Sequence, residues 1–427
     1  MTHVSSAFSQ IPVVTPDCRQ RVLIVGGSTR AAAASAIRAG FRPVCADLFA
    51  DCDTRQMAEV IPVRDFPDSL PDDVADVRAD GWFFTGALEN RPDLIERLQR
   101  RDAPYGPLWG TSPAALRLIR NPFWVAETLS GTGGPSLTVL PQSSRPAADG
   151  AWMRKPISSA GGRAVCVWDD RSSQRDMVEP VYYQQRCHGD TLSALFHCDG
   201  HSVEFLGMTR QLTGDEMSGA SEPFAYCGSI GPLRPDSFET GSFERMRHAL
   251  TGPVELLATH SGLRGIFGVD FIRDEQGTPW IVEVNPRYTA SVEIVELALR
   301  QSLLTRSGMT ASTRRWLHPD VTEETPVVAK MILFARSPFT APDMTPDSGE
   351  LWDCRSEWEI PGLADVPVPG TRIKASWPVC TVLATAPTEA ECLQRLHDRV
   401  DTVWKMVNHR ALKTAQRLPE SGPKDLL

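Results

Sequence analysis

Two apolar segments near residue 275 constrain the fold more than any other part of the sequence. Residues 265–273 (GIFGVDFIR) and 278–284 (TPWIVEV) each have the length and composition of a β-strand, and only four residues separate them. This arrangement predicts an antiparallel hairpin. Asp270 and Glu283 can then face each other, and Asn285, two residues beyond Glu283, projects from the same face. The fold must therefore hold two carboxylates and an amide oxygen at one point of an apolar hairpin.

Carboxylates placed together in apolar surroundings repel each other and lose hydration. A hard divalent cation offsets both effects, and oxygen ligands without His or Cys indicate magnesium. Asp270, Glu283 and Asn285 are therefore the candidate metal ligands. Arg287, at the end of the same segment, is placed to contact a phosphate or a substrate carboxylate. The spacing alone leaves open a second interpretation, in which Asp270 and Glu283 form structural ion pairs with nearby arginines.

The N-terminal part of the chain predicts an α/β unit that closes near residue 120. It begins with a buried strand at 21–27 (RVLIVGG), an alanine-rich helix from about 29 to 39 and a second strand at 42–47. A β-α-β order of this kind implies a parallel sheet. Further segments follow: a strand at 81–85 and helices at 92–101 and 108–120.

The first strand does not lead into a dinucleotide site. The loop reads Gly26-Gly27-Ser28-Thr29-Arg30-Ala31, which lacks the Gly-x-Gly-x-x-Gly spacing that lets backbone approach a pyrophosphate. Asp47 ends the second strand, where a ribose-binding acid would lie, but without the glycine pattern it carries little weight. A tight turn is favoured over NAD binding.

Composition excludes several classes of protein. The net charge of −9 argues against a general nucleic-acid binder, which needs basic surface. The sequence has no apolar run long enough to span a bilayer, and residues 1–15 do not resemble a signal peptide. The ten cysteines include no Cys-x-x-Cys pair, so reduced thiols are favoured over zinc ligation or a disulfide framework. These features predict a soluble, cytoplasmic protein without nucleic-acid or membrane partners.

The middle of the chain is richer in strands. A strand at 151–156 contains Lys155, a loop of small residues spans 158–162, and a second strand follows at 163–168. This pattern predicts a flexible hairpin whose backbone N–H groups can fold over phosphates. Strands at 181–186 and 192–198 are predicted to pair with each other, and a helix is predicted at 243–261.

The last third predicts a further mixture of helices and strands. Its expected elements are a helix at 291–304, a polar stretch at 310–315, a strand at 327–335, a proline-rich loop at 337–347, a strand at 372–385 and an amphipathic helix at 388–407.

Asp270 followed by Glu283-Val284-Asn285-Pro286-Arg287 resembles the metal-binding signature of the ATP-grasp superfamily. The resemblance covers nearly the whole chain and implies ATP as the nucleotide, with Mg²⁺ or Mn²⁺ held by Asp270, Glu283 and Asn285. Other segments resemble the family's nucleotide site: Lys155 with the flap residues Ser158, Ser159, Gly161 and Gly162, the interlobe residues Gln184, Gln185, Arg186 and Cys187, and Asp190 as the ribose-binding acid.

Three positions depart from the family pattern. Gln184 stands where many members have glutamate, Asp190 is about one residue off the common spacing, and Gly268 replaces an arginine found in some ligases. These departures concern the individual nucleotide contacts.

The resemblance also implies a domain organisation of mixed α/β and α+β class. A Rossmann-like pre-ATP-grasp domain is expected at 1–120, a two-lobed ATP-grasp domain at 121–308 and a small C-terminal α+β closing domain at 309–427. Many relatives form dimers, which makes a homodimer an expectation for this chain.

The function implied is that of a ligase of the carboxylate–amine or carboxylase-like branch, which activates a carboxylate as an acyl phosphate and transfers it to an amine. Lys155, Arg210 and Arg287 are the expected catalytic residues, and Tyr226 could contact the substrate. Residues 207–232 faintly resemble ligases of one-carbon cofactor assembly, of the tyramine–glutamate ligase kind. A bicarbonate-using carboxylase and a non-catalytic nucleotide-binding subunit are the two alternatives.

Overall fold

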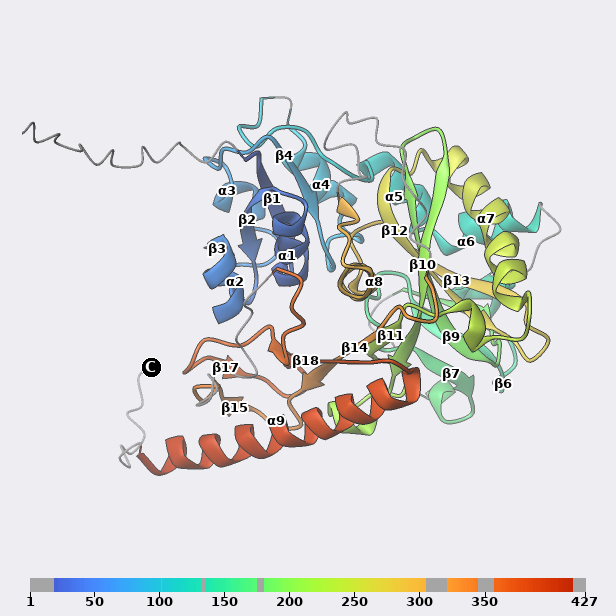
Figure 1. The fold of residues 1–427 in the computed structure, drawn as a ribbon. Helices are drawn as coiled ribbons and strands as arrows, with labels where there is room; N and C mark the ends of the chain where they lie inside the picture. Colours follow the sequence, from blue (N-terminus) through green and yellow to red (C-terminus); the bar gives the residue numbers. More distant parts are fainter. Residues whose placement is uncertain are drawn as a thin grey trace, which may run out of the picture.

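The computed structural model describes residues 19–100, 102–131, 136–174, 180–304, 321–344 and 357–417 (Figure 1). The predicted leader at 1–15 and the polar stretch at 310–315 lie outside these residues, as does the end of the proline-rich loop. Among the described residues, no helix combines the length and the apolar character that crossing a membrane requires.

The N-terminal unit is a parallel α/β layer, as the sequence predicts. Its sheet has the order β3-β2-β1-β4. The strands are β1 (Arg21–Gly26), β2 (Arg42–Asp47), β3 (Glu59–Pro62) and β4 (Gly81–Phe84), and the helices are α1 (Arg30–Arg38), α2 (Cys52–Met57), α3 (Leu70–Asp73), α4 (Pro92–Leu98) and α5 (Pro113–Ile119). β1, β2 and β4 are apolar and almost fully buried, which is typical of parallel sheets, whereas β3 at the edge is only partly buried.

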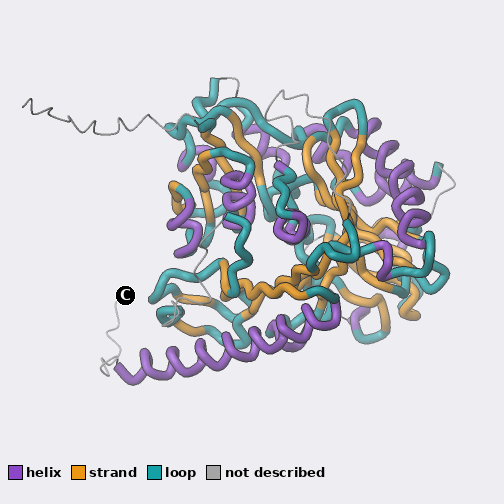
Figure 2. The backbone as a smooth tube through the Cα atoms, viewed as in Figure 1, coloured by secondary structure: helices purple, strands orange, loops and turns teal. Residues whose placement is uncertain are grey.

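A second, eight-stranded sheet runs through the middle of the molecule with the order β13-β12-β9-β10-β11-β14-β18-β16. Its strands are β9 (Asp190–Cys198), β10 (Val203–Thr213), β11 (Tyr226–Gly231), β12 (Gly265–Arg273), β13 (Pro279–Asn285), β14 (Val327–Phe334), β16 (Leu363–Ala364) and β18 (Pro378–Ala386). Because β14 and β18 extend the sheet beyond β11, the C-terminal segment shares a sheet with the middle of the chain (Figure 2).

The predicted hairpin is confirmed. β12 and β13 pair antiparallel, with Asp270 opposite Glu283 and Gly268 opposite Asn285. β12 is also paired on its other side with β9, which places the hairpin at one end of the large sheet.

A smaller sheet of four strands has the order β5-β8-β6-β7. Its strands are β5 (Val139–Pro141), β6 (Asp149–Pro156), β7 (Cys166–Asp169) and β8 (Val181–Gln185). The predicted β6–β7 pairing is confirmed, but the predicted pairing of β8 with β9 is wrong. The chain leaves the small sheet after Gln185 and enters the large sheet at Asp190, so the segment between them connects two sheets.

The remaining helices cover the large sheet. α6 (Pro122–Ser130) and α7 (Ser242–Ser261) pack beside α5 against one end of the sheet, while α8 (Ala290–Leu299) lies between the sheet and α1. α8 ends before the predicted residue 304, because Arg300 adopts a left-handed φ of 51°. α9 (Glu389–Arg417) packs on β14 and β18 and extends past the predicted residue 407.

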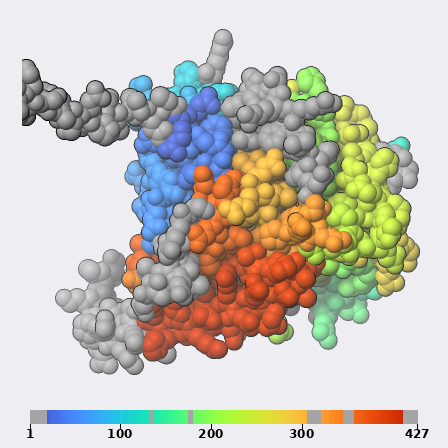
Figure 3. Space-filling view, in the orientation of Figure 1, coloured from blue at the N-terminus to red at the C-terminus, as the bar shows by residue number. Residues whose placement is uncertain are grey.

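Two short strands, β15 (Phe339–Thr340) and β17 (Arg372–Ile373), pair within the C-terminal segment. This pairing divides the predicted strand at 372–385 into β17 and β18 and gives part of the predicted loop a strand conformation. In the space-filling view, the C-terminal segment packs beneath both the N-terminal unit and the middle of the chain (Figure 3).

Candidate active site

A cavity of about 380 Å³ lies between the small sheet and the large sheet. Its walls contain most of the residues that the sequence singles out. These are Lys155, Gly161, Gly162, Gln184, Gln185, Arg186, Cys187, Asp270, Glu283, Asn285 and Arg287. Ser158, Ser159, Asp190 and Arg210 are not part of its lining.

The three oxygen-bearing side chains of the hairpin converge on this cavity, as their spacing predicts. Asp270 faces Glu283 across the strand pair, and Asn285 Nδ2 donates a hydrogen bond of 2.8 Å to Asp270 Oδ2. Burial, followed by the repulsion of Glu283, raises the pKa of Asp270 to about 6. A cation bound between the two carboxylates would remove this repulsion.

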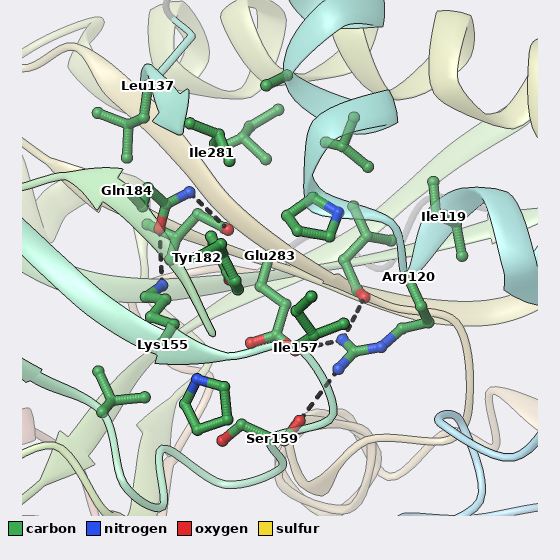
Figure 4. Close-up of a pocket in the computed structure, with 18 of the residues that line it drawn as sticks. Ile119, Arg120, Leu137, Lys155, Ile157, Ser159, Tyr182, Gln184, Ile281 and Glu283 are labelled. Atoms are coloured by element: carbon green, nitrogen blue, oxygen red, sulfur yellow. Dashed lines mark hydrogen bonds and ion pairs between the residues drawn. The ribbon is translucent and has the colours of Figure 1, made fainter. Parts of the chain in front are cut away.

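Lys155 and Glu283 come from opposite sheets and line both this cavity and a smaller adjoining pocket of about 70 Å³, which Figure 4 shows. Lys155 Nζ donates to Gln184 Oε1 at 2.7 Å, and Gln184 Nε2 donates to the carbonyl of Val282 at 3.2 Å. Burial lowers the pKa of Lys155, although Glu283 and Asp270 oppose this shift. The side chain of Gln184 therefore bridges the two sheets and fixes the amine of Lys155 in the cavity.

Arg120, the residue that caps α5, is the main contact that sequence reasoning missed. Its guanidinium forms an ion pair with Glu283 and donates to the carbonyl of Val284 at 3.2 Å. Burial acts to raise the pKa of Glu283, but Arg120 and Lys155 outweigh it, and the net shift is downward. Glu283 therefore does form an ion pair with an arginine, as the second interpretation of the sequence predicts, and it also lines the cavity.

Arg120 also connects the hairpin to the flap at 158–162. Its Nη2 donates to the carbonyl of Ser159 at 3.1 Å, and its Nε donates to Asn90 Oδ1 at 3.0 Å. Asn90 Nδ2 in turn donates to the carbonyl of Ser158 at 3.0 Å. Nothing in the local sequence around Arg120 signals these contacts, because their partners come from three distant segments.

The flap residues Gly161 and Gly162 both have positive φ, of 64° and 74°. The amide of Tyr226 donates to the carbonyl of Gly161 at 2.9 Å. A Cβ on Gly162 would lie 1.9 Å from the carbonyl oxygen of Phe224, so only glycine fits there. The flap is thus held against the segment that precedes β11.

Arg287 is fixed by the N-terminal unit. Its Nε donates to Glu89 Oε1 at 2.7 Å, and the Glu89 side chain is only 1% exposed. The carboxylate orients the guanidinium, which also lines the cavity beside Asn285.

Arg210 and Asp190 lie together outside the cavity lining. Arg210 forms ion pairs with Asp190 at 3.0 Å and with Glu389, at the start of α9, at 2.7 Å. Asp190 also pairs with Arg273 at 2.5 Å. In this structure, both of these predicted site residues therefore belong to an ion-pair network that connects the large sheet to α9.

Comparison with known proteins agrees with this architecture. A family model described as an ATP-grasp domain matches residues 131–291. No curated protein sequence matches the chain.

Solved structures share the fold at low sequence identity. An L-amino acid ligase from Bacillus licheniformis is 16% identical, with a TM-score of 0.64 over 90% of this chain and 97% of that one. The biotin carboxylase domain of a 2-oxoglutarate carboxylase from Hydrogenobacter thermophilus is 12% identical, with a TM-score of 0.65 over 90% of each chain. An N5-carboxyaminoimidazole ribonucleotide synthetase from Thermotoga maritima is 15% identical, with a TM-score of 0.59 over 90% of this chain and 98% of that one. Residues 131–291 are therefore an ATP-grasp domain, and the chain as a whole has the fold of the ATP-grasp superfamily.

Proposed function

We propose that the protein is an ATP- and magnesium-dependent ligase that activates a carboxylate as an acyl phosphate and joins it to an amine. The observation that carries this proposal is the convergence of Asp270, Glu283 and Asn285 with Lys155 and Arg287 on one cavity between two sheets. The two carboxylates and the amide suit a metal ion, and the cationic side chains of Lys155 and Arg287 suit a nucleoside triphosphate and an acidic substrate.

Asp270, Glu283 and Asn285 would hold Mg²⁺ or Mn²⁺. The donor set fits a hard cation, since it offers carboxylate and amide oxygens without His or Cys. Burial and, after it, the nearby Glu283 carboxylate raise the pKa of Asp270 to about 6, so a bound cation would favour the charged form of Asp270. Glu283 is 38% exposed, so its carboxylate is accessible from the cavity despite its contact with Arg120. When bound, the metal ion neutralises charge on the phosphates.

The other cavity residues suit the nucleotide itself. Lys155 is directed toward the carboxylates and would contact the phosphates, while Gly161 and Gly162 of the flap would cover them and exclude water. The segment 184–187, which crosses between the two sheets, would contact the adenine. Ser159 lines the adjoining pocket together with Lys155 and Glu283, whereas Ser158 and Asp190 line neither space and would reach the nucleotide only after a rearrangement.

The reaction then needs little covalent help from the protein. An oxygen of the substrate carboxylate attacks the γ-phosphorus of ATP, the bond to the β-phosphate oxygen breaks, and ADP leaves. The amine nitrogen next attacks the acyl carbon, the bond to the phosphate oxygen breaks, and the nitrogen loses a proton. Arg287, oriented by Glu89, would hold the acyl phosphate between these steps.

A carboxylase is the second candidate. The structure similar to this chain from Hydrogenobacter thermophilus was solved with MgADP, ADP and bicarbonate. In that case bicarbonate would replace the organic acid, and the activated species would be carboxyphosphate. We also propose a role in cofactor assembly, a homodimer and domain boundaries at 120 and 308. These three proposals rest on the resemblance of the sequence to the family.

The test is ADP release by the purified protein with Mg-ATP, across a panel of carboxylic acids, bicarbonate and amines. Glu283→Gln should abolish release, because it removes a metal-ligand charge. Glu275→Gln is the matched control, since Glu275 lies exposed in the turn of the same hairpin. Release that requires an acid and an amine supports a ligase, and release with bicarbonate alone supports the carboxylase. ATP binding without release under any combination would refute both.

A further inference from the structure

A second cavity, of about 360 Å³, adjoins the candidate active site. Gly161 and Tyr226 line both cavities, so the flap and the start of β11 form the wall between them. We propose that this second cavity binds the amine substrate, and that this amine carries an aromatic or branched apolar side chain together with a carboxylate. The assignment rests on the ligase function proposed above.

The cavity has a large apolar surface built from distant parts of the chain. Phe49 follows β2, Phe334 ends β14, and Trp377 precedes β18. The rings of Phe49 and Trp377 meet edge to face, with centroids 6.2 Å apart. All three side chains are only partly buried, so their rings are available to an apolar ligand. A volume of about 360 Å³ lies in the range of small-molecule sites.

Two charged side chains lie at the flap end of the same cavity. Glu222 Oε2 accepts a hydrogen bond of 2.6 Å from the amide of Ala164, which fixes its carboxylate beside the flap. Arg163 also lines the cavity, and among the described parts of the chain no carboxylate forms an ion pair with it. A positive and a negative group beside an apolar surface match the carboxylate, the ammonium group and the side chain of a hydrophobic amino acid.

The two cavities meet at Gly161, which lines both of them. Gly161 is exposed, and a Cβ there would have nothing within 4 Å, so the space beside this glycine is open. The Tyr226 hydroxyl is engaged with Ser229 Oγ at 2.7 Å, which holds the ring to one side. An amine bound near Glu222 would therefore direct its nitrogen past Gly161 toward the predicted acyl phosphate.

Trapping with hydroxylamine separates this proposal from the ligase function itself. Hydroxylamine is small enough to react with an acyl phosphate without occupying the second cavity. The wild-type protein, Mg-ATP and the acid identified by ADP release are assayed with hydroxylamine, glycine, L-leucine, L-phenylalanine and phenethylamine. If no acid gives a hydroxamate or ADP, the ligase function fails, and the second cavity is not responsible for that failure.

We expect Trp377→Ala to lower kcat/KM for L-phenylalanine at least tenfold, while hydroxamate formation and the reaction with glycine change less than twofold. Arg163→Gln should raise KM for L-phenylalanine and leave that for phenethylamine, which has no carboxylate, unchanged. Trp404→Ala is the control for Trp377, because both residues pack against the same apolar core and only Trp377 lines the cavity. Arg171→Gln, at an exposed site, is the control for Arg163.

Three outcomes would overturn the proposal. Equal losses with every acceptor in Trp377→Ala would show a structural effect. Unchanged kinetics with L-phenylalanine and L-leucine would show that the cavity does not bind the amine. A higher KM for the acid in the hydroxylamine assay would place the acid in this cavity instead.

Discussion

Replacing Arg120 by glutamine tests whether this residue joins the metal-binding hairpin to the flap and to the N-terminal unit. The arginine contacts Glu283, the carbonyls of Val284 and Ser159, and the side chain of Asn90. Glutamine is shorter and uncharged, so it can keep at most part of this network. We expect the substitution to destabilise the protein in the absence of metal and nucleotide.

The size of the effect follows from the exposure of the two partners. Removing one member of a fully buried ion pair costs about 3–5 kcal/mol. The Arg120 side chain is 12% exposed, but Glu283 is 38% exposed, so water in the cavity can solvate the carboxylate that is left behind. The loss of a hydrogen bond to a charged group, about 1.5–3 kcal/mol, is therefore the better measure for the pair. With part of the two weaker contacts to Ser159 and Asn90, the expected loss is about 3 kcal/mol.

Urea unfolding followed by both circular dichroism and tryptophan fluorescence measures this loss, provided that the two transitions coincide. The control is Arg117→Gln, one turn earlier on α5, where the ion pair with Glu96 is 49% and 63% exposed. That pair should contribute less than about 1 kcal/mol. Faster hydrogen exchange in residues 157–163 of Arg120→Gln would show that the flap has been released. A loss within about 0.5 kcal/mol of the control, with unchanged exchange, would refute the reasoning.

Three further expectations follow from buried charges. Lys155→Ala should raise KM for ATP at least tenfold in the ADP-release assay, because Lys155 faces the cavity and the carboxylates from the small sheet; an unchanged KM would exclude a phosphate contact. Glu293→Ala should destabilise the protein by about 3–5 kcal/mol in urea, because it leaves Arg30 and Lys330 buried without their shared partner; a loss under about 1 kcal/mol would contradict this. Burial raises the pKa of Asp51 to about 9, above the value of about 3.9 expected in the unfolded chain, so its contribution to stability is lost as pH rises from 4 to 9. Asp51→Asn should therefore gain stability relative to wild type with rising pH in thermal unfolding, and a difference that does not change with pH would show that the pKa is not raised.

The sequence by itself determines the parts of the fold that depend on residues near each other along the chain. The short turn between β12 and β13 and the alternation of their side chains place Asp270, Glu283 and Asn285 on one face, as the structure confirms. The β-α-β opening predicts the parallel N-terminal sheet for the same reason. In each case, a connection of only a few residues or a single helix leaves little choice of partner.

Only the tertiary structure decides which distant segments meet. The strands β8 and β9 are adjacent in sequence, yet they belong to different sheets: β8 pairs with β5 and β6, and β9 pairs with β10 and β12. Alternation of side chains identifies a strand but not the strand beside it.

The same limit applies to the charges. Arg287 pairs with Glu89, Arg120 with Glu283, and Arg210 with Glu389, and these partners are between 163 and 198 residues apart. A buried arginine predicts that an anion lies near it, because an unpaired buried charge is costly. Whether that anion is a phosphate, a substrate or a remote carboxylate depends on how three segments of the chain pack together, which residue spacing does not encode.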